Sequence, residues 1–258
     1  VLRVEGSMTG ILKPPHIIGH RGAAGYAPEN TLASFKKAKE LGVPWVEFDV
    51  KETDDGVLIL MHDDTFERTT NGQGDVARSL WSDVKRYDAG SFFSPEFRGE
   101  RVPSLLEAFE CLENLGLGAN IEIKPCLGRE VRTAVAIANT IVTHWPKSLP
   151  QPLISSFSIE SLFACKQVQP QLNLGILFER LPINWQHLTI QLKFRTLHIN
   201  ERHLTKENAN FIHEKGYPIL VYTVNSNERA QELFSWGIQS VISDFPDKIL
   251  SGKNLSNP

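Results

Sequence analysis

The chain has 258 residues, of which 41% are hydrophobic and 22% charged, a composition typical of a globular protein. Its 27 basic and 30 acidic residues give a formal net charge of −3 with no long run of either sign, so nucleic acid is not an expected partner. No apolar segment approaches the roughly 20 residues of a membrane span, and no basic-then-apolar secretory signal opens the sequence. We therefore expect no stable membrane anchoring.

Two short end segments are set apart from the fold. Residues 1–7 precede Met8 and are interpreted as a cloning scar, while residues 251–258 are interpreted as a polar tail. A single domain is expected over residues 8–250. The three cysteines of the chain have no metal-type spacing, which together with the lack of a signal predicts a cytoplasmic protein.

The first third of the chain alternates strand and helix patterns. The apolar run 16–20 predicts a strand, and a helix is expected to follow with Asn30 as its N-cap and Gly42 as its C-terminal stop. A second strand is predicted at 45–50. The run 57–62 follows a turn signal and is expected to pair back on this strand as a hairpin.

Six more apolar runs predict strands at 119–124, 152–157, 172–178, 195–200, 218–224 and 240–244. Helical periodicity is expected between them near 104–115, 128–144, 158–168, 204–215 and 226–236. With the first two strands this makes eight strands in alternation with helices, the pattern of a (β/α)8 TIM barrel. An open doubly wound sheet is the alternative, but no Gly-rich dinucleotide fingerprint opens any of these helices.

One segment interrupts the alternation. Residues 63–102 contain turn signals and several aromatic residues that are expected to be exposed: Trp81, Tyr87, Phe92, Phe93 and Phe97. A long insertion in a compact barrel is more often a lid or binding loop than a linker. We expect a small inserted subdomain here.

Carboxylates stand on the inner face of the second predicted strand. Side chains alternate along a strand, so Glu47 and Asp49 share one face, opposite the apolar side chains that pack on the helices. Buried carboxylates must be paired or must bind a metal. Salt bridges to Lys or Arg are the ordinary explanation for a single acid. For two acids at i and i+2 on an apolar strand, metal binding is favoured.

The strand 119–124 repeats this pattern. Glu122 supplies a third carboxylate, and three oxygen ligands at one mouth of the barrel suit one divalent cation, Mg²⁺ or Ca²⁺. Lys124 lies on the same face. It can neutralise Glu122 as a structural pair, or it can bind a phosphate beside the metal.

Two of the eight histidines end apolar strands. His20 is followed by Arg21, a planar and permanently charged donor that matches phosphate, and His62 is followed by acidic residues. Two imidazoles at one mouth can divide the base and acid roles, since they titrate near neutral pH. A metal, cationic clamps and an acid/base pair together favour phosphoryl transfer. Acyl transfer is disfavoured because no Gly-x-Ser-x-Gly elbow is present.

These motifs resemble the glycerophosphodiester phosphodiesterase family, in particular its short cytoplasmic bacterial members. The resemblance rests on "HRGAAGYAPENT", "VEFDVKETDDGVLILMHDDTFERTTNG", "IEIKP" and "VYTVN", and runs in order from about residue 16 to 245. It implies a TIM barrel with an insertion after the second histidine. It also implies the following roles: metal ligands Glu47, Asp49 and Glu122, phosphate contacts Arg21 and Lys124, and acid/base residues His20 and His62. Many relatives have tryptophan where this chain has Tyr222, which keeps an aromatic wall for the substrate.

The resemblance implies small-molecule substrates, namely glycerophosphodiesters such as glycerophosphocholine and glycerophosphoethanolamine. These are cleaved to sn-glycerol 3-phosphate and an alcohol. We assign His20 as base and His62 as acid, with either water or the glycerol 2-hydroxyl as first nucleophile. Two alternatives are a lipid-directed phospholipase D of the same barrel family and a catalytically silent, ligand-binding barrel. The sequence is compatible with a monomer or a homodimer.

Overall fold

A computed structural model describes residues 13–251 of the chain. The interpreted scar at 1–7, the start of the expected domain at Met8 and all but Ser251 of the interpreted tail lie outside the described residues.

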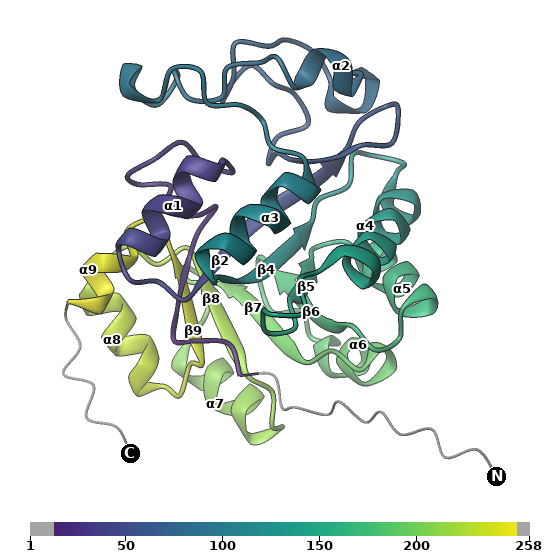
Figure 1. Cartoon of the computed structure of the whole chain (residues 1–258). Coiled ribbons are helices and arrows are strands. Elements are labelled where there is room, and N and C mark those ends of the chain that lie inside the picture. Colours follow the sequence, from purple (N-terminus) through teal and green to yellow (C-terminus); the bar gives the residue numbers. More distant parts are fainter. Residues whose placement is uncertain (1–12, 252–258) are drawn as a thin grey trace.

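Eight parallel strands form a closed barrel, which confirms the predicted TIM-barrel fold (Figure 1). The strands are β1 Ile17–Gly19, β2 Trp45–Glu52, β4 Gly118–Ile123, β5 Leu153–Ser156, β6 Asn173–Phe178, β7 Thr196–Asn200, β8 Ile219–Tyr222 and β9 Ser240–Ser243. The barrel closes where β1 pairs with β2, with Ile18 opposite Trp45. Each strand lies within a few residues of its predicted place.

Helices surround the barrel between successive strands. They are α1 Leu32–Glu40, α3 Leu105–Leu115, α4 Glu130–His144, α5 Ile159–Val168, α6 Trp185–Leu192, α7 Lys206–Glu214, α8 Asn227–Ser235 and α9 Pro246–Leu250. The main core lies between helices and strands. Val46, Phe48 and Val50 of β2 are fully buried in it, so the carboxylates of this strand face the barrel interior as predicted.

Two local expectations were wrong or incomplete. The N-cap of α1 is Thr31, whose hydroxyl accepts from the Ser34 amide, and not Asn30, which has a left-handed φ of 57°. Helices α6 and α9 were not predicted. Helix α9 has only five residues. Helix α6 has eight residues, lacks a side-chain N-cap bond and ends at Lys193 in the left-handed region rather than at glycine, so the usual terminal signals are missing.

The long strand β2 extends beyond the barrel, and β3, Leu58–Leu60, pairs antiparallel with this extension. The inserted segment begins just after β3 and projects from the barrel (Figure 1). It contains α2, Trp81–Val84, and two short 3₁₀ turns, Val76–Arg78 and Pro95–Phe97.

The inserted segment has a small hydrophobic core of its own. Phe66, Val76 and Val84 are fully buried in it. Of the aromatic side chains expected to be exposed, Phe92 and Phe93 are exposed. The other three are half-buried: Trp81, Tyr87 and Phe97. The insertion is therefore a packed unit rather than an open loop.

His198 of β7 is entirely buried inside the barrel, with Nε2 2.9 Å from Thr196 Oγ1. Burial lowers the pKa of His198 to about 3. In the unfolded chain the imidazole has its ordinary pKa near about 6.5. Below that value the unfolded state binds a proton that the folded state does not, so stability falls as the pH drops toward the folded pKa.

We therefore expect a His198→Asn variant to be less acid-sensitive than the wild type. The imidazole contributes a loss of about 2 kcal/mol between about pH 6.5 and 4.5, from roughly 1.4 kcal/mol per pH unit. Urea unfolding of both proteins at the two pH values measures this difference. Equal losses in the two proteins would show that His198 protonates readily in the folded state.

Candidate active site

Three carboxylates meet inside the mouth of the barrel. Glu47 and Asp49 come from β2 and Glu122 from the neighbouring β4, where Asp49 and Glu122 lie directly opposite one another in the strand register. One oxygen from each residue lies within 4.8 Å of the other two, and all three residues are buried. The predicted acidic cluster is therefore present as a compact group of oxygens.

Two basic side chains contact this cluster. Arg21 Nε lies 3.3 Å from Asp49 Oδ2, while Lys124 Nζ lies 3.3 Å from Glu122 Oε1 and 3.7 Å from Asp49 Oδ1. The salt-bridge explanation therefore accounts for part of the charge. Among residues 13–251, no Lys or Arg side chain forms an ion pair with Glu47 within 4.0 Å. Arg21 contacts Glu47 through its backbone N–H, which donates to Oε2 at 3.1 Å.

The pKa values of the three acids are shifted in different directions. Burial, with the charges of Asp49 and Glu122, raises the pKa of Glu47 well above its usual range. Burial and the charge of Asp49 raise the pKa of Glu122 to about 7. Burial opposes ionisation of Asp49 as well, but the charges of Arg21 and Lys124 hold its pKa below the ordinary value. If all three acids are ionised, their three negative charges exceed the two positive charges of Arg21 and Lys124, which adds to the effect of burial in raising the pKa values of Glu47 and Glu122.

The oxygen donors fit a hard divalent cation. Carboxylate oxygens are the ligands that Mg²⁺ and Ca²⁺ prefer, and an uncompensated buried carboxylate favours a bound cation. Glu47, Asp49 and Glu122 are the residues that can hold it.

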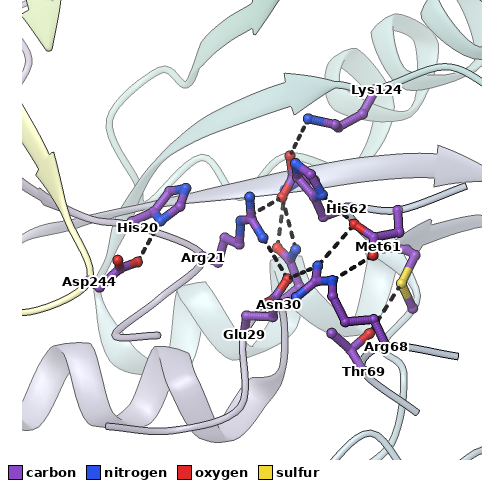
Figure 2. A network of polar contacts seen from close by, with 12 residues as sticks. His20, Arg21, Glu29, Asn30, Met61, His62, Arg68, Thr69, Lys124 and Asp244 are labelled. Atoms are coloured by element: carbon purple, nitrogen blue, oxygen red, sulfur yellow. Dashed lines mark hydrogen bonds and ion pairs between the residues drawn. The ribbon is translucent and has the colours of Figure 1, made fainter. Parts of the chain in front are cut away.

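Each predicted catalytic histidine is held by its own carboxylate. His20 Nδ1 lies 2.6 Å from Asp244 Oδ1, and His62 Nδ1 lies 2.6 Å from Asp63 Oδ1. Figure 2 shows the His20–Asp244 pair on one side of the network and His62 on the other. Because Nδ1 is engaged in both rings, Nε2 is the nitrogen left for proton transfer. Burial lowers the pKa of His62.

Sequence reasoning missed three residues of this site. Asp244 follows β9 as His20 follows β1, so the strand-end argument would have found it. Asp63 adjoins His62 in the sequence. Asn30 donates to Asp49 Oδ2 at 2.9 Å and accepts from the Asp49 amide at 3.1 Å, which depends on its left-handed backbone. No pattern in the sequence indicated that conformation.

A pocket of about 320 Å³ opens over these groups. Seven of the eight predicted site residues line it: His20, Arg21, Asp49, His62, Glu122, Lys124 and Tyr222. Glu47 is absent from the lining. The opposite wall comes from β5, β7 and β8 and their loops: Phe157, Asn200, Glu201, Arg202 and Thr223.

Tyr222 and Phe157 form an aromatic wall of this pocket. Their rings meet edge to face with centroids 5.9 Å apart, and the Tyr222 hydroxyl donates to the Phe178 carbonyl at 3.0 Å. The hydroxyl is thus engaged away from the ligand space. Tyr222 lines the pocket, and its role as a substrate wall stays a prediction.

Residues 20–248 match the glycerophosphoryl diester phosphodiesterase family. The chain belongs to this family. A glycerophosphodiester phosphodiesterase of Caldanaerobacter subterraneus is 33% identical over 91% of this chain and 96% of its own length. One from Bacillus subtilis is 32% identical over 92% of this chain and 86% of its own length.

The glycerophosphoryl diester phosphodiesterase fold is also found among solved structures similar to this one. A phosphodiesterase from Oleispira antarctica, solved in complex with the product sn-glycerol-3-phosphate, superposes with a TM-score of 0.89. The two proteins are 38% identical, over 92% of this chain and 96% of that one. These comparisons confirm the family that the motifs indicated.

Proposed function

We propose that this protein hydrolyses glycerophosphodiesters, such as glycerophosphocholine and glycerophosphoethanolamine, to sn-glycerol 3-phosphate and an alcohol. The observation that carries the proposal is one pocket that lies over an acidic cluster able to hold a cation and is lined by two carboxylate-held histidines and two basic side chains. The similar Oleispira phosphodiesterase with its bound sn-glycerol-3-phosphate supports the substrate class.

One divalent cation, Mg²⁺ or Ca²⁺, is part of this proposal, with Glu47, Asp49 and Glu122 as its ligands. When bound, such a cation acts as a Lewis acid toward the phosphoryl group. Arg21 and Lys124 bind the phosphate, and their charges stabilise the negative charge that develops on it. Both side chains line the pocket beside the acidic cluster, which supports these roles.

His20 serves as the general base and His62 as the general acid. As the nucleophile forms its bond to phosphorus, its proton passes to Nε2 of His20. The bond from phosphorus to the alcohol oxygen breaks, and His62 protonates that oxygen. Asp63, whose Oδ1 lies 2.6 Å from Nδ1 of His62, supports the donor assignment because its charge stabilises the imidazolium that the acid role requires. Asp244 holds His20 in orientation.

The first nucleophile is either water or the glycerol 2-hydroxyl, and the same proton transfers serve both. Attack by the 2-hydroxyl releases the alcohol and leaves a cyclic glycerophosphate. Water then opens it: His62 takes the proton of the water and His20 returns its proton to the departing 2-oxygen. A product analysis at early times separates these routes, because only the second one accumulates the cyclic diester.

The test of the proposal is a product assay for sn-glycerol 3-phosphate across head groups, with and without Mg²⁺ or Ca²⁺. We expect release of sn-glycerol 3-phosphate that depends on the cation. Faster release of choline from lysophosphatidylcholine, with lysophosphatidic acid as the other product, than from glycerophosphocholine would instead indicate a lipid-directed phospholipase D. Binding without turnover of any diester would indicate a silent barrel and refute the proposal.

We also propose a cytoplasmic protein that acts as a monomer or homodimer on small molecules, not on nucleic acid. The free thiols of Cys111, Cys126 and Cys165 are consistent with a reducing compartment. Within residues 13–251, no helix is long and apolar enough to cross a membrane. Cell fractionation and size-exclusion chromatography with light scattering test the location and the oligomeric state.

A further inference from the structure

Arg68 of the inserted segment forms paired hydrogen bonds with two carboxylates at once. Its Nη1 and Nη2 donate to Glu29 Oε2 and Oε1, each at 2.8 Å. Its Nε and Nη2 donate to Asp63 Oδ2 and Oδ1 at 2.5 and 3.0 Å. Figure 2 shows the guanidinium at the centre of this network, beside Glu29. Paired bonds of this kind fix both position and orientation.

Each carboxylate passes this constraint on to a different residue of the active site. Glu29 Oε1 also accepts from Arg21 Nη1 at 2.6 Å, and Asp63 Oδ1 lies 2.6 Å from His62 Nδ1. Hydrogen bonds from Arg68 lower the pKa values of both Glu29 and Asp63, so both stay ionised as partners. A continuous chain of contacts thus runs from Arg21 through Arg68 to His62.

Packing on both sides of Arg68 holds it in place. Phe66 is fully buried in the core of the insertion, and its carbonyl accepts from the Thr70 hydroxyl at 2.8 Å. Thr69 is buried as well, with its hydroxyl 3.6 Å from the Met61 sulfur. The Arg68 backbone therefore stands on a packed turn rather than on a free loop.

The insertion does not form a wall of the active-site pocket. None of the residues that line this pocket falls within 63–102. The role of the insertion as a lid or binding loop stays a prediction, because no residue of it lines this pocket. The insertion instead contacts residues of the active site through Arg68 and Asp63.

We propose that Arg68 is a positioning residue that sets Arg21 and His62 relative to one another through Glu29 and Asp63. The inserted segment then serves as a support for the active site. This inference rests on the proposed function of the pocket. A lysine cannot replace Arg68, because a single ammonium group lacks the fork that engages two carboxylates bidentately.

The test compares Arg68→Ala and Arg68→Lys with Arg78→Ala. Arg78 lies in the same insertion, is exposed and, within residues 13–251, forms an ion pair only with Asp75, so its replacement removes the same charge away from the network. We expect both Arg68 variants to lose about 10- to 100-fold in kcat/KM, the range for residues that orient catalytic groups. The Arg78 variant keeps wild-type kinetics. Wild-type kinetics in Arg68→Lys would refute the proposal.

Two more variants separate the arms of the network. Glu29→Gln releases Arg21 and is expected mainly to raise KM, while Asp63→Asn releases His62 and is expected mainly to lower kcat. Arg68→Ala should do both. In the double variant Arg68→Ala/Asp63→Asn, the total fold-loss in kcat should be smaller than the product of the fold-losses of the two single variants. Independent, fully multiplicative effects would contradict a shared network.

Crystal structures of the variants give a readout that does not need turnover. In the Arg68→Ala variant we expect the Arg21 and His62 side chains to leave their present positions while the barrel stays unchanged. In the Arg78→Ala variant the same two side chains should stay in place. Unmoved side chains would overturn the inference even if activity fell. If the wild type itself hydrolyses no glycerophosphodiester, the proposed function fails, while these structures still decide the positioning role.

Discussion

Replacing His62 by alanine is expected to lower kcat for glycerophosphocholine by about 10²- to 10⁴-fold, the usual contribution of general acid–base catalysis. The KM should change little, because Arg21 and Lys124 still bind the phosphate. The fall in kcat is expected because the alkoxide of choline is a poor leaving group without a proton from His62. Release of sn-glycerol 3-phosphate measures the loss. His187→Ala, on the exposed side of α6, is the matched control.

A diester with an acidic leaving group, such as a nitrophenol, tests the direction of proton transfer. A nitrophenolate leaves without protonation, so His62→Ala should recover much of its activity on this substrate. His20→Ala should stay impaired on both substrates, because the nucleophile still needs a base. The opposite pattern would exchange the two roles. Full activity of His62→Ala on glycerophosphocholine would remove it from the mechanism altogether.

The barrel was predictable because its signals are local and repeat along the chain. Alternation of short apolar runs with helical periods indicated each of the eight barrel strands, and the period of two along 45–50 placed Glu47 and Asp49 on the inner face. Helix α6 was missed because such local signals are absent at its ends. It has no glycine stop and no side-chain cap, so nothing local marked its ends.

The site was predictable only where strand ends determine it. His20, Asp49, Glu122 and Lys124 end strands or sit near their ends, so a shared mouth brings them together whatever the loops do. Arg68 and Glu29 are 39 positions apart and meet through two loop conformations. Their contact depends on the packed turn around Phe66, and no periodic pattern reports such a turn.

A Glu122→Gln variant should separate the stability of the barrel from its cation binding. The pKa of Glu122 is raised to about 7 by burial and the charge of Asp49, above the ordinary carboxyl value. The cation-free protein therefore loses stability as the pH rises from about 4.5 through about 7, where the folded state must give up a proton it prefers to keep. At about pH 8 the cost of this ionisation reaches roughly 3 kcal/mol, at about 1.4 kcal/mol per pKa unit.

We therefore expect Glu122→Gln to unfold at a higher temperature than the wild type at about pH 8 when no cation is present. Adding Mg²⁺ or Ca²⁺ at a thousandfold excess over Kd should reverse the order, because the wild type then gains about 4.1 kcal/mol and the variant gains little. Glu113→Gln on α3 is the control. Its carboxylate accepts only the Ser148 hydroxyl among the described residues, so both conditions should leave its behaviour like that of the wild type.

The turnover rate should depend on cation binding and not on the stability of the folded protein. The stabilised Glu122→Gln protein is expected to lose at least about 10²-fold in kcat, as when one important stabilising group of an active site is removed, and chelation of the wild type by EDTA should give a comparable loss. A variant that is both less stable without cation and still activated by Mg²⁺ would show that Glu122 serves Lys124 as a structural partner, and that the cation site lies elsewhere.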